Sequence, residues 1–348
     1  MIRVTQLKSL EDLSKVIVED DRKFYSATHD EILNGATTDV YFLRTLDILK
    51  ELDLDKAIVT AEIFPRKDGI FAGIEEVKSL LKGKSLKVEA VEEGASFTAK
   101  ETLIRITGPY NEFAIHETTM LGILASSSGW ATAARRVTES CGNSYYLCFG
   151  ARHVHPAVAP VMERAAVIGG AKGASCILAA GLAGISPSGT LPHSAMLIAG
   201  DTLKVAKAYN ALSPADHQRI VLVDTFKDEV EEAIRIADEL GDDLFAVRVD
   251  TPSERGGVTP GLIKEIRAKL DLAGHSSVKV FATGGLYPEK IELLKEAGAE
   301  GFGVGSYISA ASPIDMTMDI KIVEGKPIAK RGRIPGLVDN PNLKEIIL

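Results

Sequence analysis

The chain has few cysteines and no long apolar run. Its three cysteines, Cys141, Cys148 and Cys176, are an odd number and lack paired C-x-x-C spacing, so neither a disulfide framework nor a structural zinc site is expected. The most apolar stretch, Cys176–Ile185, is far too short to span a bilayer. Met1–Asp21 has no apolar core of signal-peptide length. We therefore expect a reduced, cytoplasmic protein without a membrane partner.

An excess of positive charge is also absent. Lysine and arginine number 40 against 48 acidic residues, which gives a net charge of −8, so nucleic acid is not an expected partner. An anionic substrate would then need locally placed basic side chains, backbone N–H groups or a divalent metal. The 348 residues, 45% hydrophobic and 25% charged, suit a soluble globular protein of two domains.

Residues 1–115 predict an α+β domain in which strands are grouped together. Apolar residues recur at helical intervals after the segment Gly35–Asp39, which we expect to cap a helix running to Leu52. The other expected elements are helices at Leu10–Glu19 and Ile74–Leu81 and strands at Ala57–Pro65, Leu86–Val91 and Thr102–Thr107.

A long helical pattern then leads into a repeated unit of strand, loop and helix. The helix, Phe113–Glu139, is interrupted by small residues at Ser126–Gly129, which predict close packing, and it makes residues 116–140 a connecting helix. Residues 141–315 predict an irregular (β/α) barrel, because strand–helix units recur there at intervals of roughly 25–35 residues. We expect irregularity around Lys172–Leu191. The tail, 316–348, is expected to return strands (Asp319–Val323 and Ile328–Arg331) to the first domain, an α/β sandwich.

The strand ends of this barrel are expected near Phe149, Thr190, Asp224, Asp250, Thr283 and Val304. Two of these strands stop at glycine turns, Gly284-Gly285 and Gly305-Ser306, with one helix between them. Backbone N–H groups in such turns bind phosphate without side-chain charge, and the last two strand loops of a barrel are a frequent phosphate site. Ordinary turns are the structural alternative.

Polar residues at the same rim are the candidate functional residues. Each also has a structural explanation: Asp224 and Asp250 could cap helices, Arg248 could be a paired structural charge, and His193 could sit at a helix start. Arg152 could form only a local ion pair. Convergence at one rim favours function, and phosphate-binding turns beside aspartates suit a phosphorylated sugar with Mg²⁺ carried by pyrophosphate.

Seven short motifs in this order resemble the nicotinate phosphoribosyltransferase family, particularly its short archaeal-type members. They are Gly35–Tyr41, Phe149–His153, Gly189–His193, Val223–Thr225, Arg248–Asp250, Thr283–Gly285 and Gly303–Ser306. The resemblance implies a type II phosphoribosyltransferase, with an α/β sandwich beside an irregular barrel and active sites shared across a homodimer. It implies transfer of ribose 5-phosphate from phosphoribosyl pyrophosphate to nicotinate with Mg²⁺, a step of NAD biosynthesis.

The resemblance also assigns roles to residues. Phe149 would stack on one face of the pyridine ring and Tyr41, from the other subunit, on the opposite face, with Arg152 near the base. Asp224, Arg248, Asp250 and Thr190 would surround pyrophosphate, Mg²⁺ and the ribose hydroxyls, with Asp224 contacting the Mg²⁺ carried by pyrophosphate. The 5′-phosphate would bind at Gly284, Gly285, Gly305 and Ser306.

His193 matches a histidine that family members phosphorylate when they couple the reaction to ATP, which classes them as ligases. Many larger members have glutamate after it, where this chain has Ser194, so ATP coupling is left open. Quinolinate phosphoribosyltransferase is the alternative enzyme, although its dicarboxylate substrate needs several basic residues and only Arg152, His153 and Lys172 offer themselves. Nicotinamide as substrate and a catalytically silent homologue are further alternatives.

Overall fold

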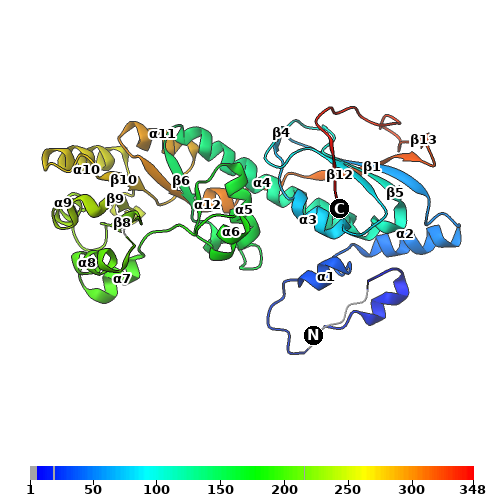
Figure 1. The fold of residues 1–348 in the computed structure, drawn as a ribbon, viewed down its shortest axis with the longest axis horizontal. Coiled ribbons are helices and arrows are strands. Elements are labelled where there is room, and N and C mark those ends of the chain that lie inside the picture. Colours follow the sequence, from blue (N-terminus) through cyan, green and yellow to red (C-terminus); the bar gives the residue numbers. More distant parts are fainter. Residues whose placement is uncertain (1–5, 19, 215) are drawn as a thin grey trace. The chain divides into compact units, whose positions relative to one another are not determined.

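The computed structural model describes residues 6–18, 20–214 and 216–348. It divides into two compact units, Met1–Thr132 with Ser312–Leu348 and Ala133–Ala311. Helix α4 (Glu117–Cys141) begins in the first unit and ends in the second, so the division falls inside the helix that the sequence predicts as a separate connector. Both units are drawn in Figure 1.

The first unit contains a six-stranded antiparallel sheet in the order β13-β12-β1-β5-β3-β14. Its central strand β1 pairs with β12 from Val59↔Val323 to Pro65↔Met316, so the C-terminal tail completes the sandwich sheet as predicted. The second tail strand, expected at Ile328–Arg331, is not observed; the tail forms strands at Lys326–Pro327 and Lys344–Ile346 instead. The strands of this unit are β1 (Ile58–Pro65), β3 (Lys87–Ala90), β5 (Ile104–Pro109), β12 (Met316–Val323), β13 (Lys326–Pro327) and β14 (Lys344–Ile346), with β2 (Gly69–Ile70) and β4 (Ser96–Phe97) as a separate pair.

Helices α1 (His29–Leu33), α2 (Val40–Glu51) and α3 (Ile74–Leu81) belong to this unit. Helix α3 buries Ile74, Val77 and Leu81, the spacing of an amphipathic helix. Asp39 is the residue before α2, but its side chain accepts from Thr118 Oγ1 (3.0 Å) instead of capping the helix. The helix expected at Leu10–Glu19 is a 3₁₀ turn at Leu10–Lys15, and Glu19 lies outside the described residues.

The small residues in α4 do not interrupt the helix, contrary to the sequence prediction. They allow close packing, as expected. The hydroxyl of Ser128 accepts from the backbone N–H of Ala72 (3.2 Å), and a Cβ on Gly129 would lie 2.5 Å from the carbonyl oxygen of Ser312. Larger side chains at these positions would push neighbouring backbone away.

The second unit holds a six-stranded parallel sheet in the order β7-β6-β11-β10-β9-β8. Strands β7 and β8 pair with only one neighbour each among the described residues, so the irregular barrel is open, a half-barrel. The strands are β6 (Tyr145–Cys148), β7 (Gly173–Ala174), β8 (Arg219–Leu222), β9 (Leu244–Val249), β10 (Lys279–Ala282) and β11 (Gly301–Val304).

The helices of this unit are α5 (Ala159–Gly169), α6 (Ile177–Leu182), α7 (His193–Ala199), α8 (Thr202–Leu212), α9 (Glu229–Leu240), α10 (Pro260–Leu272), α11 (Pro288–Glu296) and α12 (Ser306–Ser309). The strand expected to end near Thr190 is absent from the described residues. Thr190 lies in the connection between α6 and α7. The strand that pairs with β6 at this end of the sheet is the short β7. Among the described residues, no helix is both long and apolar enough to cross a membrane.

Candidate active site

Five parallel strands place the predicted residues along one edge of the sheet. Because parallel strands all end at the same edge, the order β6-β11-β10-β9-β8 arranges the residues that follow them as Phe149, Gly305, Gly284, Asp250 and Asp224. An added Cβ on Gly305 would lie 2.6 Å from the carbonyl oxygen of Phe149, and one on Gly284 would lie 3.0 Å from Asp250 Oδ1. The structure thus brings these residues to one edge of the sheet.

Arg248 is held by a fixed set of acceptors at this edge. Its Nη2 donates to Asp250 Oδ2 (2.6 Å), its Nε to Thr283 Oγ1 (2.9 Å) and its Nη1 to Thr190 Oγ1 (2.6 Å). Burial lowers the pKa of Arg248 and the neighbouring Asp250 opposes that shift; a guanidinium stays charged in proteins regardless. Thr190 thus reaches the site through the side chain of Arg248 and not through a strand.

His193 faces both aspartates. Its Nε2 lies 3.5 Å from Asp224 Oδ2 and 3.9 Å from Asp250 Oδ2, while its Nδ1 is 3.2 Å from Thr225 Oγ1. His193 is also the first residue of α7, which agrees with its structural alternative. The histidine ring therefore lies close to both carboxylates.

Neither aspartate caps a helix, so that structural alternative is wrong. Asp228 caps α9 and Thr259 caps α10. The Asp224 side chain is fully buried, and its two carboxylate oxygens have no hydrogen-bond partner within the described residues. Burial raises the pKa of Asp224, and His193 partly offsets that shift.

A divalent cation fits this chemistry. Two buried carboxylate oxygens without partners on Asp224 are the hard oxygen ligands that Mg²⁺ prefers. No group of three or more His, Cys, Asp or Glu in the described part of the chain could hold a metal by itself. An ion here would need further ligands from the substrate or water, as Mg²⁺ bound to a pyrophosphate has.

Phe149 forms the wall beside Arg248. Its ring centre lies 5.8 Å from Arg248 Cζ and 6.4 Å from the ring centre of Phe281. A Cβ on Gly303 would lie 2.6 Å from atoms of Phe149 and Thr283. The glycine therefore sets how deeply the Phe149 ring sits, and the ring is left half-buried.

The two glycine turns lie next to each other because β10 pairs with β11. Gly284 and Gly285 have φ of 92° and 60°, a conformation that glycine adopts without strain. Within the described residues, the backbone N–H groups of Gly284, Gly285 and Gly305 donate no hydrogen bond to another backbone group. Free N–H donors of this kind are suited to binding an anion.

Lys290 is a residue at this turn that the sequence analysis missed. Its Nζ donates to the carbonyl oxygen of Gly284 (3.4 Å), and burial lowers its pKa. Its position in the first turn of α11, directly after the glycine pair, is the signal that could have identified it.

Glu163 is a second residue that was missed. Its carboxylate is fully buried and accepts from the backbone N–H groups of Gly150 (3.0 Å), Ala151 (3.0 Å) and Cys176 (2.7 Å) and from the Ser175 hydroxyl (2.9 Å). It thereby joins the loops after β6 and β7. A single acid inside the otherwise apolar start of α5 was the available signal.

Arg152 and Tyr41 are not drawn into these contacts. Arg152 is exposed in the 3₁₀ turn Ala151–His153 and forms no ion pair among the described residues. Tyr41 belongs to the other unit and is 51% exposed on α2. Desolvation, with Glu117 and Asp39 nearby, raises the pKa of Tyr41. The roles of both residues in binding a base stay predictions.

Most of the chain matches the models of one protein family. Residues 39–128 match the family described as quinolinate phosphoribosyl transferase, N-terminal domain, and residues 130–319 match its C-terminal domain. The crystal structure of a nicotinate-nucleotide pyrophosphorylase from Pyrococcus furiosus superimposes with a TM-score of 0.86 at 43% identity, over 91% of this chain and 82% of that one.

Individual relatives carry two different names. A nicotinate phosphoribosyltransferase of Mycobacterium tuberculosis is 31% identical over 269 residues, 74% of this chain and 56% of that protein. A probable nicotinate-nucleotide pyrophosphorylase (carboxylating) of Methanothermobacter thermautotrophicus is 25% identical over 282 residues, 79% of this chain and 93% of that protein. The chain spans about half the length of the nicotinate phosphoribosyltransferases that it matches.

Proposed function

The chain belongs to the quinolinate phosphoribosyl transferase family, and from this membership we propose that it transfers ribose 5-phosphate from phosphoribosyl pyrophosphate to the ring nitrogen of a pyridine carboxylate, in NAD biosynthesis. One observation carries the proposal. A single sheet edge carries glycine N–H groups without a backbone acceptor among the described residues, the Arg248–Asp250 pair, the buried carboxylate of Asp224 and the half-buried ring of Phe149.

The reaction asks for positioning and for charge stabilisation. The ring nitrogen forms a bond to C1′ with its lone pair, and the C1′–O bond breaks with its electrons leaving on pyrophosphate. Between these events the sugar has oxocarbenium character, so the protein must hold the ring in line and stabilise the departing charge. We assign the pyrophosphate to Arg248, the 5′-phosphate to the turns at Gly284 and Gly305, and the flat ring to Phe149.

Asp250 and Asp224 would hold the ribose hydroxyls and Mg²⁺. The metal, when bound with pyrophosphate, supplies positive charge that stabilises the leaving group. Asp250 already orients Arg248 through Oδ2, which leaves its Oδ1 for a hydroxyl donor. Asp224 has both oxygens without partners in the described part of the chain, and we therefore place it nearest the cation.

Nicotinate is the base that we favour. A dicarboxylate such as quinolinate needs several cations around the ring, whereas Arg248 is already paired with Asp250. Burial and Arg152 lower the pKa of His153, which disfavours the cationic form of that side chain. Arg152 is then left as the cation closest in sequence to Phe149, which matches one carboxylate.

Quinolinate is the second candidate, because the family carries that name and a similar chain is called a nicotinate-nucleotide pyrophosphorylase. Steady-state assays with phosphoribosyl pyrophosphate and Mg²⁺ decide between nicotinate, quinolinate and nicotinamide. We expect nicotinate to have the highest kcat/KM. Turnover of quinolinate alone would reverse the assignment, and release of no pyrophosphate with any base would overturn the proposed activity.

ATP coupling through His193 can be tested in the same assay. His193 Nε2 lies between two carboxylates, a place where it can bind pyrophosphate without being phosphorylated. We expect activity without ATP and at most a modest increase with it. Incorporation of radioactive phosphate from ATP into the wild-type chain but not into His193→Asn would show that the histidine is a phosphoryl acceptor.

A further inference from the structure

A separate pocket in the first unit has the character of an anion site. It encloses about 260 Å³ and is lined by Gln6, Leu7, Lys8, Leu46, Lys50, Asp55, Lys84, Asn111, Glu112 and Ile115. These residues come from the segment before the first 3₁₀ turn, helix α2, the loop after α3 and the turns after β5. Three of them are lysines, in a chain whose net charge is −8.

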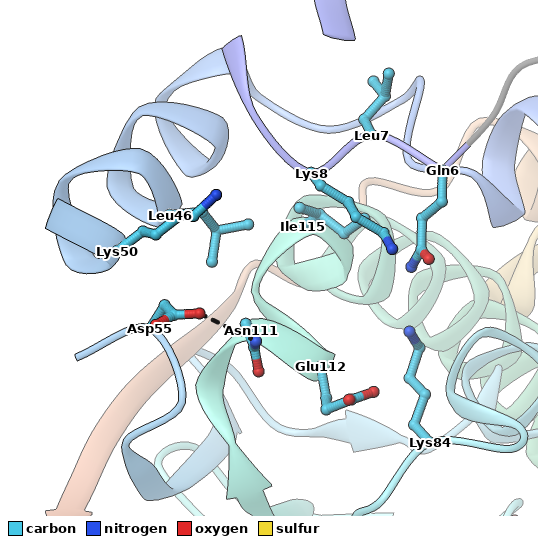
Figure 2. A pocket seen from close by; sticks show the side chains of 10 residues that line it. All are labelled: Gln6, Leu7, Lys8, Leu46, Lys50, Asp55, Lys84, Asn111, Glu112 and Ile115. Atoms are coloured by element: carbon cyan, nitrogen blue, oxygen red, sulfur yellow. Dashed lines mark hydrogen bonds between the residues drawn. The ribbon is translucent and has the colours of Figure 1, made fainter. Parts of the chain in front are cut away.

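The ammonium groups of the pocket lysines have no partner among the described residues. No ion pair or hydrogen bond involves the Nζ atom of Lys8, Lys50 or Lys84 there, and the backbone N–H of Lys8 donates to Asp12 Oδ2 (2.7 Å). Figure 2 shows the side chains of Lys8 and Lys84 directed toward each other and toward the amide of Gln6, with Glu112 to the left of Lys84. Two ammonium groups that face one space repel each other unless an anion lies between them.

Lys84 has an unusual environment for a lysine. It is half-buried, and desolvation lowers its pKa, with Lys8 acting in the same direction and Glu112 against it. The nearby His116 is buried and its two ring nitrogens have no hydrogen-bond partner within the described chain. Burial and the charge of Lys84 lower the pKa of His116 to about 4. Glu112 therefore offsets part of the positive charge of Lys84, and His116 adds no acceptor to it.

The opposite side of the pocket is apolar and amide-lined. Leu7, Leu46 and Ile115 are buried core residues that reach the pocket wall. The Oδ1 atom of Asn111 is buried without a partner among the described residues, and its Nδ2 is 3.4 Å from Asp55 Oδ2. The volume lies slightly below the roughly 300–1,000 Å³ of drug-sized ligand pockets, so a ligand would be small.

We propose that this pocket binds a small organic phosphate, with the phosphate between Lys8 and Lys84 and the apolar part against Leu7, Leu46 and Ile115. The site lies within one unit, and none of its residues belongs to the catalytic edge of the parallel sheet. Its occupancy does not depend on the reaction proposed above. A bound phosphate would pair two ammonium groups that have no partner in the described part of the chain.

Protection of the lysines from acetylation gives a residue-specific test. The full chain is treated with a limiting amount of acetic anhydride with and without phenyl phosphate, and the modified lysines are quantified by mass spectrometry. At a phenyl phosphate concentration ten times Kd, acetylation of Lys8 and Lys84 should slow about tenfold, because the free fraction falls as 1/(1+[L]/Kd). Lys82, exposed on the same loop and outside the pocket, should react unchanged.

Affinity measurements separate the pocket from the catalytic edge. Calorimetry uses Arg248→Gln as the parent protein, so that phosphate binding at the barrel edge is weakened. Lys84→Gln keeps most of the aliphatic stem and should weaken binding of phenyl phosphate by about 10- to 100-fold, the range of a hydrogen bond to a charged group. The matched control, Lys82→Gln, should bind like the parent.

Three results would overturn the inference. They are equal slowing at Lys82 and Lys84, equal affinity of the Lys84→Gln and Lys82→Gln proteins, and absence of any heat in the parent. Inorganic phosphate serves as a second probe and should bind more weakly than phenyl phosphate. Equal affinity for the two probes would contradict the apolar half of the site. None of these readouts requires catalysis, so they are unaffected if the proposed reaction fails.

Discussion

The Nε2 atom of His193 lies 3.5 Å from Oδ2 of Asp224, yet neither oxygen of that buried carboxylate accepts a hydrogen bond within the described residues. A buried ionised group with incomplete partners destabilises a fold. Such an arrangement is common where a protein binds ligand or cation, because the ligand supplies the missing interactions. The pair is therefore where stability and activity should respond in opposite directions.

Asp224→Asn should raise stability and lower activity. Burial raises the pKa of Asp224. The wild-type carboxyl group therefore makes its full contribution to stability below its unfolded pKa of about 3.9, and this contribution is lost as the pH rises through the folded pKa. We expect the variant to be more stable at pH 7 by on the order of 1 kcal/mol, with the gain vanishing near pH 3.5. Denaturant unfolding at several pH values measures it.

The same variant should lose about 100-fold or more in kcat/KM, the usual effect of removing one preorganised charge. A variant that unfolds more easily at pH 7 than the wild type would instead favour a structural role for Asp224.

Arg248→Lys should reduce kcat/KM by about 100-fold although the charge is retained. The guanidinium donates to Asp250, Thr283 and Thr190 at once, and an ammonium group cannot reproduce that planar fork. Steady-state kinetics with phosphoribosyl pyrophosphate as the varied substrate measure the loss. Arg235→Lys, whose partners are Asp201 and Glu232, is the control and should keep full activity. Equal effects of the two replacements would remove Arg248 from the reaction.

Glu163→Gln should destabilise the second unit and raise the KM for the base. The carboxylate accepts four hydrogen bonds from the loops after β6 and β7, and an amide leaves at least one donor without an acceptor, at about 1–3 kcal/mol. Ser175→Ala removes one donor only and should have the smaller effect. If Glu163→Gln lowers stability but leaves KM for the base unchanged, the residue holds the fold without positioning the loop of Arg152.

Gly303→Ala should raise the KM for the base most strongly, with a smaller rise in the KM for the sugar donor, because the added Cβ would also lie 2.6 Å from Thr283, which accepts from Arg248. The added methyl group would lie 2.6 Å from the Phe149 ring, so the ring must move. Gly181→Ala is a matched control, because nothing lies within 4 Å of its added Cβ. Kinetics with each substrate varied in turn separate the two KM values; a change in the donor KM alone would contradict a stacking role for Phe149.

Tyr41→Ala and Arg152→Ala should each lose activity and regain part of it when the two variants are mixed. This follows if the chain forms a dimer in which each site takes Tyr41 from one subunit and Arg152 from the other. Mixed dimers can be made by co-expression with two different tags. In each mixed dimer, one of the two sites would contain both Tyr41 and Arg152, and the other would contain neither. Inactive mixed dimers would reject the shared site, and a monomer by light scattering would reject the dimer.

The strand ends were predictable because each parallel strand is a short apolar run followed by a polar residue. Asp224, Asp250 and Gly284 each lie within two residues of an observed strand end. Thr190 was misplaced, since Cys176–Ile185 is apolar but forms the short helix α6, and apolar runs of that length do not distinguish strand from helix.

Other features depend on contacts between residues far apart in the chain. Among the described residues, strands β2 and β4 pair with each other and with no other strand. Each has two residues, which is too short to show the alternation of apolar and polar residues that identifies a strand in a sequence. The pocket of the first unit brings together Lys8, Lys84 and Asn111, which belong to no common sequence motif. The opening between β7 and β8 follows from how many strands pair, and no local pattern records that number.

The groups that we propose to bind phosphate at the two glycine turns are backbone N–H groups, which every amino acid except proline carries. Exchange of side chains around Phe149 and Arg152 can therefore change which aromatic ring is accepted while recognition of the sugar phosphate is inherited intact. We expect divergence among relatives of this chain to separate acceptors much more often than donors.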